Sequence, residues 1–354
     1  MRILRTFLAT TAVVAVGLAA PSTSASAVPA PPGAMPVVPA SAGTLVPGPV
    51  HYLWPQGHQA SVAAQTAAVD QSNDLHYAGG AAVPGSVATT PELYLVFWGS
   101  QWSKTDPAAG YLQAFFQGLY GPGDDWTSVA SQYCEGVPAG TITCPSTASH
   151  VGAPNGPLVK GVWFDDAQPA IPISPVANVE QYCPPATTSC VALDQMGAEA
   201  TRAAAHFGNT APASNTQAIY LIALPSKFLS TGEPYYCGYH RDIASNYGDV
   251  AFINLPYVAD IGAGCYQNAV NANGTYDGFS IIGGHEYMEA VTDMRTNLAW
   301  IDASGEENGD KCAGITTGQG AMADLNLSTG TFAVQSTWSN AFNGGAGGCV
   351  LHNS

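Results

Sequence analysis

Residues 283–312 read GGHEYMEAVTDMRTNLAWIDASGEENGDKC. Only 10% of the chain's residues are charged, yet this stretch holds His285 and 7 of the 25 acidic residues of the whole chain. The seven are Glu286, Glu289, Asp293, Asp302, Glu306, Glu307 and Asp310. In a sparsely charged sequence, that concentration calls for an explanation.

The first part of the stretch has the spacing of a metal-binding helix. On an α-helix, His285 and Glu289 stand four residues apart and so lie on one face, one turn above the other. Glu286 lies roughly 100° round the helix from His285. In zinc proteases, residues at i and i+4 hold the metal and the intervening Glu is the general base. Here Glu289 takes the place of the second histidine, so the spacing predicts a zincin-like active-site helix with an altered ligand.

A third metal ligand has to come from outside the helix. Zinc accepts carboxylate oxygens, so one histidine and two carboxylates can hold it and leave a position open for water. Glu307 is the preferred third ligand beside His285 and Glu289, because it follows a turn flanked by glycine. Asp310 and Glu306 are the alternatives.

The predicted chemistry is metal-assisted hydrolysis. The metal would lower the pKa of a bound water and polarise a carbonyl, and Glu286 would pass the proton to the leaving amine. His240 is the second candidate catalytic residue, although a purely structural loop histidine is the competing interpretation. Tyr287, Tyr239 and His240 are all candidates to stabilise an oxyanion. Asp293 is expected to cap or orient a ligand or a neighbouring loop in preference to binding the metal.

The N-terminal part of the chain has a different character. Residues 1–27 carry two arginines, an apolar run and an Ala-Ser-Ala site, which is typical of a secretory signal peptide. Residues 28–74 are rich in Pro and Ala and indicate a linker or pro-segment, with a possible short helix at 60–69. Residues 75–354 are expected to form one domain. The protein is therefore predicted to be secreted and extracellular.

Charge narrows the range of partners. The formal net charge is −16, and removal of the signal peptide with its two arginines makes it −18. A chain this acidic is not expected to bind nucleic acid or anionic lipid. No run after the signal peptide is long enough to predict a membrane span. The sequence gives no indication of the oligomeric state.

Eight cysteines all follow the predicted signal peptide. An even number in an exported chain predicts disulfides, although spacing alone does not determine their connectivity. We expect sequential pairing, in which the last bridge ties the acidic loop to a C-terminal strand near 332–336. The expected pairs are Cys134–Cys144, Cys183–Cys190, Cys237–Cys265 and Cys312–Cys349.

Hydrophobic patterning predicts the fold class. Asp106 and Pro107 open a helix with an apolar face, because proline favours the first helical position. A second helix is expected at 191–207. Strands are predicted at 93–97, 159–164, 218–224 and 250–254. Strands and helices that alternate in this way predict an α/β domain with a mixed sheet, stapled by disulfides.

Several short motifs in this order resemble those of the EXORDIUM-like, phosphate-induced-protein family of secreted proteins. They are LHY with GG (75–80), LYLVFWG (93–99), CGYH (237–240), HEYMEAVTD (285–293), AWID (299–302) and ENGDKC (307–312). Family members carry comparable Cys-Gly-aromatic-His and Glu-x-Gly-Asp-x-Cys segments, which supports Glu307 as a ligand. Some plant members lack the His-Glu pair, so the resemblance does not itself imply catalysis.

The residues favour a secreted metal-dependent hydrolase, a zinc peptidase acting on a peptide or protein substrate. Two alternatives stay open. The acidic cluster could bind calcium, which prefers oxygen ligands, but His285 would then have no role. It could also be structural, in a non-catalytic extracellular or cell-wall-associated protein.

Overall fold

The computed structural model describes residues 53, 55–56, 73–80, 84–166, 193–226 and 236–353. The chain divides into two compact units, Met1–Ala40 and Ser41–Ser354, and every described residue belongs to the second. The predicted signal peptide, the possible helix at 60–69 and the expected Cys183–Cys190 bridge all lie outside the described residues.

The largest sheet among the described residues has five strands in the order β5-β2-β6-β8-β7. Its strands are β2 (Glu92–Trp98), β5 (Val159–Asp165), β6 (Ala218–Ala223), β7 (Tyr239–Ser245) and β8 (Gly248–Leu255). The first four strands in this order run parallel, whereas β7 runs antiparallel to β8. The predicted mixed sheet is therefore confirmed, and four of its five strands coincide with predicted ones.

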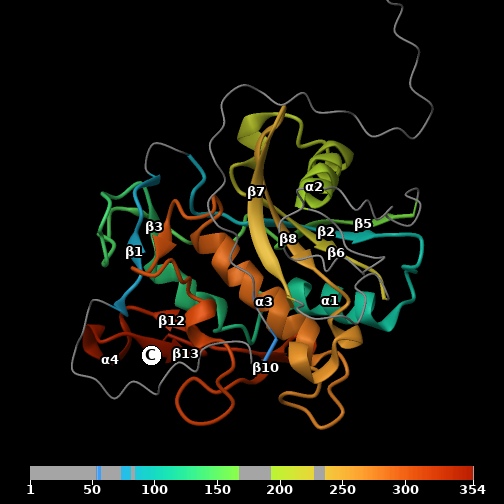
Figure 1. Cartoon of the computed structure of the whole chain (residues 1–354). Coiled ribbons are helices and arrows are strands. Elements are labelled where there is room, and N and C mark those ends of the chain that lie inside the picture. The colour runs from blue at the N-terminus through green and yellow to red at the C-terminus, as the bar shows by residue number, and fades with distance from the viewer. Residues whose placement is uncertain are drawn as a thin grey trace, which may run out of the picture. The chain divides into compact units, whose positions relative to one another are not determined.

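Helices cover both faces of this sheet, as Figure 1 shows. Helix α2 (Leu193–Phe207) packs on one face, whereas α1 (Pro107–Gly118) and α3 (Asp277–Thr292) lie on the other. Side chains alternate along a strand, so Leu93, Leu95 and Phe97 of β2 face α1 and α3. Tyr94, Val96 and Trp98 face α2. The predicted α/β layering is confirmed.

The start of α1 follows directly from local sequence. The Asp106 carboxylate accepts hydrogen bonds from the backbone N–H groups of Ala108 and Ala109, and Pro107 occupies the first turn. Leu112, Phe115 and Phe116 are fully buried in the core beneath the sheet. This core extends from α1 to the metal-binding candidates on α3.

The remaining strands and one short helix lie outside the five-stranded sheet. They are β1 (His76–Tyr77), β3 (Cys134–Glu135), β4 (Ser149–His150), β9 (Trp300–Ile301), β10 (Ala323–Leu327), β11 (Gly330–Val334), β12 (Thr337–Ser339), α4 (Phe342–Gly345) and β13 (Gly348–Val350). Four antiparallel pairs form among them: β1–β9, β3–β4, β10–β11 and β12–β13. Strands of two or three residues are too short to be recognised in the sequence, whereas β11 overlaps the strand expected near 332–336.

Three of the four expected disulfides lie within the described residues, and all three are confirmed. They are Cys134–Cys144, Cys237–Cys265 and Cys312–Cys349. No helix among the described residues combines the length and the apolar character that a membrane crossing requires.

Candidate metal centre

Helix α3 carries three of the predicted site residues, and every residue of this helix is buried. Glycine lets it lie close to its neighbours, since a Cβ at Gly284 would approach Trp126 to 3.0 Å and Phe115 to 3.2 Å. His285, Glu286 and Glu289 are therefore held on a rigid element surrounded by protein. Their exposed fractions are 0%, 0% and 1%.

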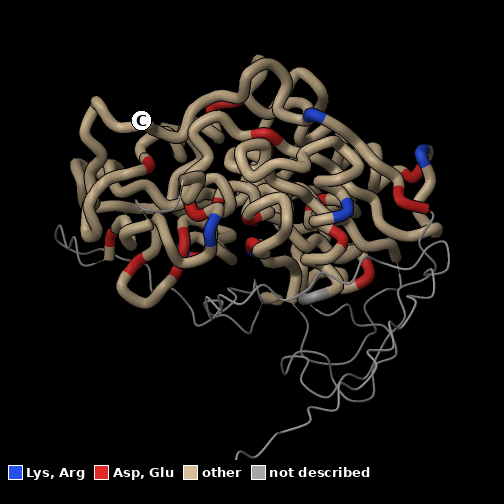
Figure 2. The backbone as a smooth tube through the Cα atoms, turned by 90° about the horizontal axis from the view of Figure 1, so that it is seen from above, with Lys and Arg blue, Asp and Glu red and all other residues tan. Residues whose placement is uncertain are grey.

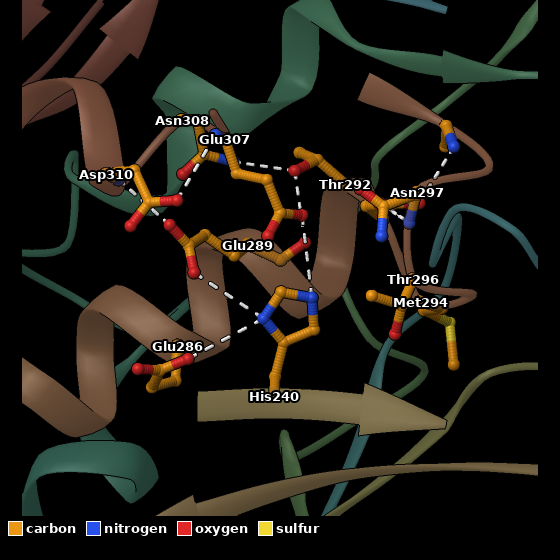
Figure 3. Close-up of polar contacts among 12 residues, drawn as sticks. His240, Glu286, Glu289, Thr292, Met294, Thr296, Asn297, Glu307, Asn308 and Asp310 are labelled. Atoms are coloured by element: carbon orange, nitrogen blue, oxygen red, sulfur yellow. Dashed lines mark hydrogen bonds and ion pairs between the residues drawn. The ribbon is translucent and has the colours of Figure 1, made fainter. Parts of the chain in front are cut away.

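His240 was expected in a loop, but it lies on β7. It pairs with Ile253 of β8, and its side chain is 2% exposed. Strand alternation sends Tyr239 to the opposite face of the sheet, where it packs against Tyr236 and Phe252. Tyr239 therefore points away from α3, and His240 points towards it, as Figure 3 shows.

The acidic loop after β9 brings Glu307 to the same place. Asn308 fixes this loop to the end of α3, because its amide donates to the Met288 carbonyl at 2.8 Å and to the Thr292 hydroxyl at 2.6 Å. The Gln335 amide donates to the Gly309 carbonyl at 2.9 Å. The loop is thus held from two sides, and Glu307 is fully buried.

These elements bring five side chains together: His240, His285, Glu286, Glu289 and Glu307. We call them the buried His/Glu cluster. Nδ1 of His240 lies 3.5 Å from Glu289 Oε2 and 3.6 Å from Glu286 Oε2, and its Nε2 lies 3.5 Å from Glu307 Oε1. On the other side of Glu289, His285 Nε2 lies 3.1 Å from Glu289 Oε1. Figure 3 shows His240 between the carboxylates of α3 and of the acidic loop.

Two groups of three within the cluster have the spacing of metal ligands. One atom from each of His240, Glu289 and Glu307 lies within 4.8 Å of the others, and so does one atom from each of His285, Glu286 and Glu289. Glu289 belongs to both groups. The predicted ligands His285 and Glu289 fall in one group, whereas the preferred third ligand, Glu307, falls in the other with His240.

Most polar atoms of the cluster make no hydrogen bond to any group in the described part of the chain. This holds for both ring nitrogens of His240 and His285 and for both carboxylate oxygens of Glu286 and Glu307. Buried polar groups are usually hydrogen-bonded, so a cluster of exceptions requires a physical reason. Glu289 differs, because its Oε1 accepts the backbone N–H of Asp310 at 2.9 Å.

The surrounding carboxylates dominate the electrostatics of both histidines. Burial alone would lower the pKa of His240, but Glu307 and the two glutamates of α3 outweigh it and raise the pKa well above its usual range. Burial would also lower the pKa of His285, but the neighbouring carboxylates, Glu289 above all, outweigh burial and raise this pKa well above its usual range.

The three glutamates differ from one another. Burial raises the pKa of Glu286 to about 7, against the opposing effect of the two histidines. Burial also raises the pKa of Glu307 well above its usual range, and His240 opposes this shift only in part. Burial disfavours ionisation of Glu289 as well, but His285 and His240 outweigh it and hold the pKa below its usual range. Glu289 is thus the most strongly anionic member of the cluster.

The other predicted residues lie around the cluster. Asp310 Oδ1 is 3.6 Å from His285 Nε2, whereas Glu306 is exposed to solvent. The Asp293 carboxylate accepts the backbone N–H groups of residues 297, 298 and 299, so it orients the loop after α3 as expected. The Tyr287 hydroxyl donates to the Tyr120 hydroxyl at 3.1 Å.

Two glycines let the backbone lie directly against the cluster. A Cβ at Gly238 would approach Glu286 Oε1 to 2.8 Å, and one at Gly309 would approach His285 Nδ1 to 2.7 Å. Neither approach was predicted from the sequence, although both glycines lie in the CGYH and ENGDKC motifs. The signal for this close approach that the sequence did offer was a glycine near a candidate site residue in each motif.

Comparisons with protein-family models, with curated proteins and with solved structures find no match to this chain.

Proposed function

We propose that the protein is a metal-dependent hydrolase that uses zinc, with peptides as its substrate class. The observation that carries this proposal is the buried His/Glu cluster. Three carboxylates taken out of water with no hydrogen-bond donors for most of their oxygens are unfavourable unless positive charge accompanies them, and among the cluster's own side chains only the two histidines, whose pKa the glutamates raise, can carry it. A divalent cation would supply that charge and satisfy the free atoms at once.

The free atoms favour His240, Glu289 and Glu307 as the metal ligands. Oε1 of Glu289 is already engaged by the Asp310 N–H, which leaves Oε2 on the side of His240. This choice departs from the expectation based on sequence, in which His285 was the ligand. His285 would instead orient Glu289 from the other side, and such outer partners commonly position a metal-binding carboxylate.

The same choice leaves Glu286 uncoordinated and available as a general base. Zinc in this position would act as a Lewis acid that activates water and polarises a carbonyl. Glu286 would accept a proton as the water oxygen bonds to the carbonyl carbon, and would donate it to the amine nitrogen as the C–N bond breaks. Electrons and protons balance without a further reactant.

The donor atoms argue against calcium. Calcium takes six to eight oxygen ligands, whereas this cluster contributes two imidazoles whose nitrogens have no hydrogen bond among the described residues. A purely structural role is also disfavoured, because each unsatisfied buried polar group costs about 1–3 kcal/mol. A non-catalytic protein would have no evident gain to offset that cost.

Other features support an extracellular peptidase. Three disulfides are compatible with an oxidising compartment, which agrees with the proposed signal peptide and secretion. Acidic positions outnumber basic ones along the described backbone, as Figure 2 shows, which disfavours nucleic acid as a partner. Membership of the EXORDIUM-like family rests on the shared short motifs and is part of the proposal.

The test is metal analysis combined with peptide cleavage by the purified mature protein. The wild type should hold about one zinc per chain, cleave peptides, and lose activity with a chelator. Glu286→Gln should bind zinc as the wild type does but lose about 10²-fold or more in kcat, since it lacks the basic oxygen. Glu307→Gln should lose zinc as well as activity.

Glu306→Gln is the matched control, because it makes the same change at the exposed neighbour of Glu307. It should leave zinc content and rate unchanged. A fully active Glu286→Gln variant, or a wild type that binds zinc yet cleaves nothing in a broad peptide library, would refute the hydrolase proposal.

A further inference from the structure

A short piece of the N-terminal segment is bound next to the cluster. Leu53 pairs in antiparallel fashion with Gly238, which directly precedes β7. The Leu53 N–H donates to the Gly238 carbonyl at 3.1 Å, and the Cys237 N–H donates to the Leu53 carbonyl at 2.6 Å. Three residues further on, the Gln56 N–H donates to the Gly264 carbonyl at 2.9 Å. The short blue segment in Figure 1 marks these residues.

Side chains reinforce this backbone pairing. Leu53 is 1% exposed and belongs to the same core cluster as Ile282 of α3. Pro55 is buried and would contact a Cβ placed on Gly264. The disulfide Cys237–Cys265 joins the two segments that Leu53 and Gln56 contact. A chain with a large apolar side chain at the position of Leu53 therefore fits this surface, and the disulfide holds the two segments of the surface together.

The surface lies against the candidate base. A Cβ at Gly238 would be 2.8 Å from Glu286 Oε1 and equally close to Ile282, so the backbone that pairs with Leu53 also lies against Glu286. A chain bound in this position would lie beside the cluster, on the side of its uncoordinated carboxylate. Among the described residues, Gly238 is thus the point at which a paired segment of the N-terminal region and a catalytic candidate share one backbone neighbour.

We propose that the backbone at Cys237 and Gly238 is a docking edge for an extended peptide, and that the chain segment of Leu53, Pro55 and Gln56 occupies this edge in cis. The ligand class is a peptide with a large apolar residue followed two positions later by proline, paired through its main chain. The inference deepens the proposed function, because it relies on the hydrolase proposal for the claim that such a peptide is a substrate. Displacing residues 53–56 exposes the edge.

The test measures binding without turnover, in a full-length Glu286→Gln background. The probe is a fluorescent synthetic peptide with the sequence of residues 49–58. Leu53→Asp should release the internal segment, because it places a charge in the core, and so should strengthen binding of the probe by about tenfold or more. A probe with aspartate in place of its leucine should bind at least about tenfold more weakly.

Gln56→Ala is the matched control, because its side chain is exposed and its backbone hydrogen bond is kept. It should bind the probe no better than the parent does. Hydrogen exchange at the Cys237 amide should be slow in the parent, faster in Leu53→Asp, and slow again when the probe is added.

Each remaining outcome is decisive. Failure of Leu53→Asp to fold would show that Leu53 is an integral part of the core, and would overturn the proposal. A folded Leu53→Asp chain that does not bind the probe would overturn it as well. Because binding is read without hydrolysis, loss of the hydrolase proposal would show itself separately, as a zinc-bound wild type that cleaves no peptide.

Discussion

Replacing Gly309 with alanine tests whether the acidic loop positions the cluster. The backbone of Gly309 has φ −79° and ψ −46°, which alanine adopts without strain. The effect of Gly309→Ala should therefore come only from its added methyl group. That methyl would lie 2.7 Å from His285 Nδ1 and 2.8 Å from Glu289 Oε1.

The size of the effect follows from these distances. Ordinary contacts of a Cβ begin at 3.4 Å, so the imidazole or the loop must move by about 0.7 Å. Overpacking of this kind typically costs about 1–3 kcal/mol. Because the methyl would contact the proposed ligand Glu289 and its neighbour His285, we expect zinc affinity to fall by at least the roughly 10–100-fold that is typical when outer-sphere partners of metal ligands are disturbed.

The assay is competition for zinc with a chromophoric chelator, alongside urea unfolding of the zinc-free protein. Gly110→Ala on α1 is the control, because a Cβ there meets nothing within 4 Å. It should leave zinc affinity unchanged and stabilise the helix by up to about 1 kcal/mol. Zinc affinity in Gly309→Ala equal to that of the wild type would refute the positioning role of the loop.

Two further predictions concern stability away from the cluster. Burial raises the pKa of Glu199 to about 9 against the opposing effect of Arg202, so the folded state keeps a proton that the unfolded chain releases above the usual pKa of 4.5. The stability linked to Glu199 is complete below pH 4.5 and is lost as pH rises towards 9. Urea unfolding should therefore show the free energy of unfolding falling by about 2–3 kcal/mol more between pH 6 and pH 8 in the wild type than in Glu199→Gln, and equal slopes would contradict the shifted pKa. Removing the Cys312–Cys349 bridge, with its separation of 37 residues, by a double serine substitution should cost about 3–4 kcal/mol by thermal or urea unfolding, and an unchanged midpoint would contradict this.

The sheet could be predicted from sequence because its signals are local. The strands β2, β6 and β8 each contain a continuous apolar run, as expected for parallel strands covered on both faces. The Asp-Pro start of α1 is a capping signal contained in a few residues. β7 was missed because its sequence, YHRDIAS, mixes polar and apolar residues and follows a motif interpreted as a loop. Its place in the sheet depends on pairing with β8, which no short window of sequence contains.

The candidate site was predictable only in part, for a related reason. Helical spacing places Glu286 and Glu289 beside His285, and that part of the site needs nothing beyond the geometry of one helix. Which histidine Glu307 approaches depends on how the acidic loop folds back along α3. Asn308 fixes the position of the loop through hydrogen bonds to the end of the helix. A single asparagine in the sequence does not reveal that it will make these bonds.

The disulfides indicate how such a costly arrangement persists. His240 follows Cys237 by three residues, and Glu307 precedes Cys312 by five, so each contributor from outside α3 has a bridge close to it. The chain must hold Glu307 against a helix whose carboxylates carry the same charge, and their mutual repulsion would otherwise separate the acidic loop from α3. Bridges that restrict the unfolded chain add stability without adding polar contacts inside the cluster. The ligand atoms of the cluster can therefore remain free for a cation instead of being used to hold the fold together.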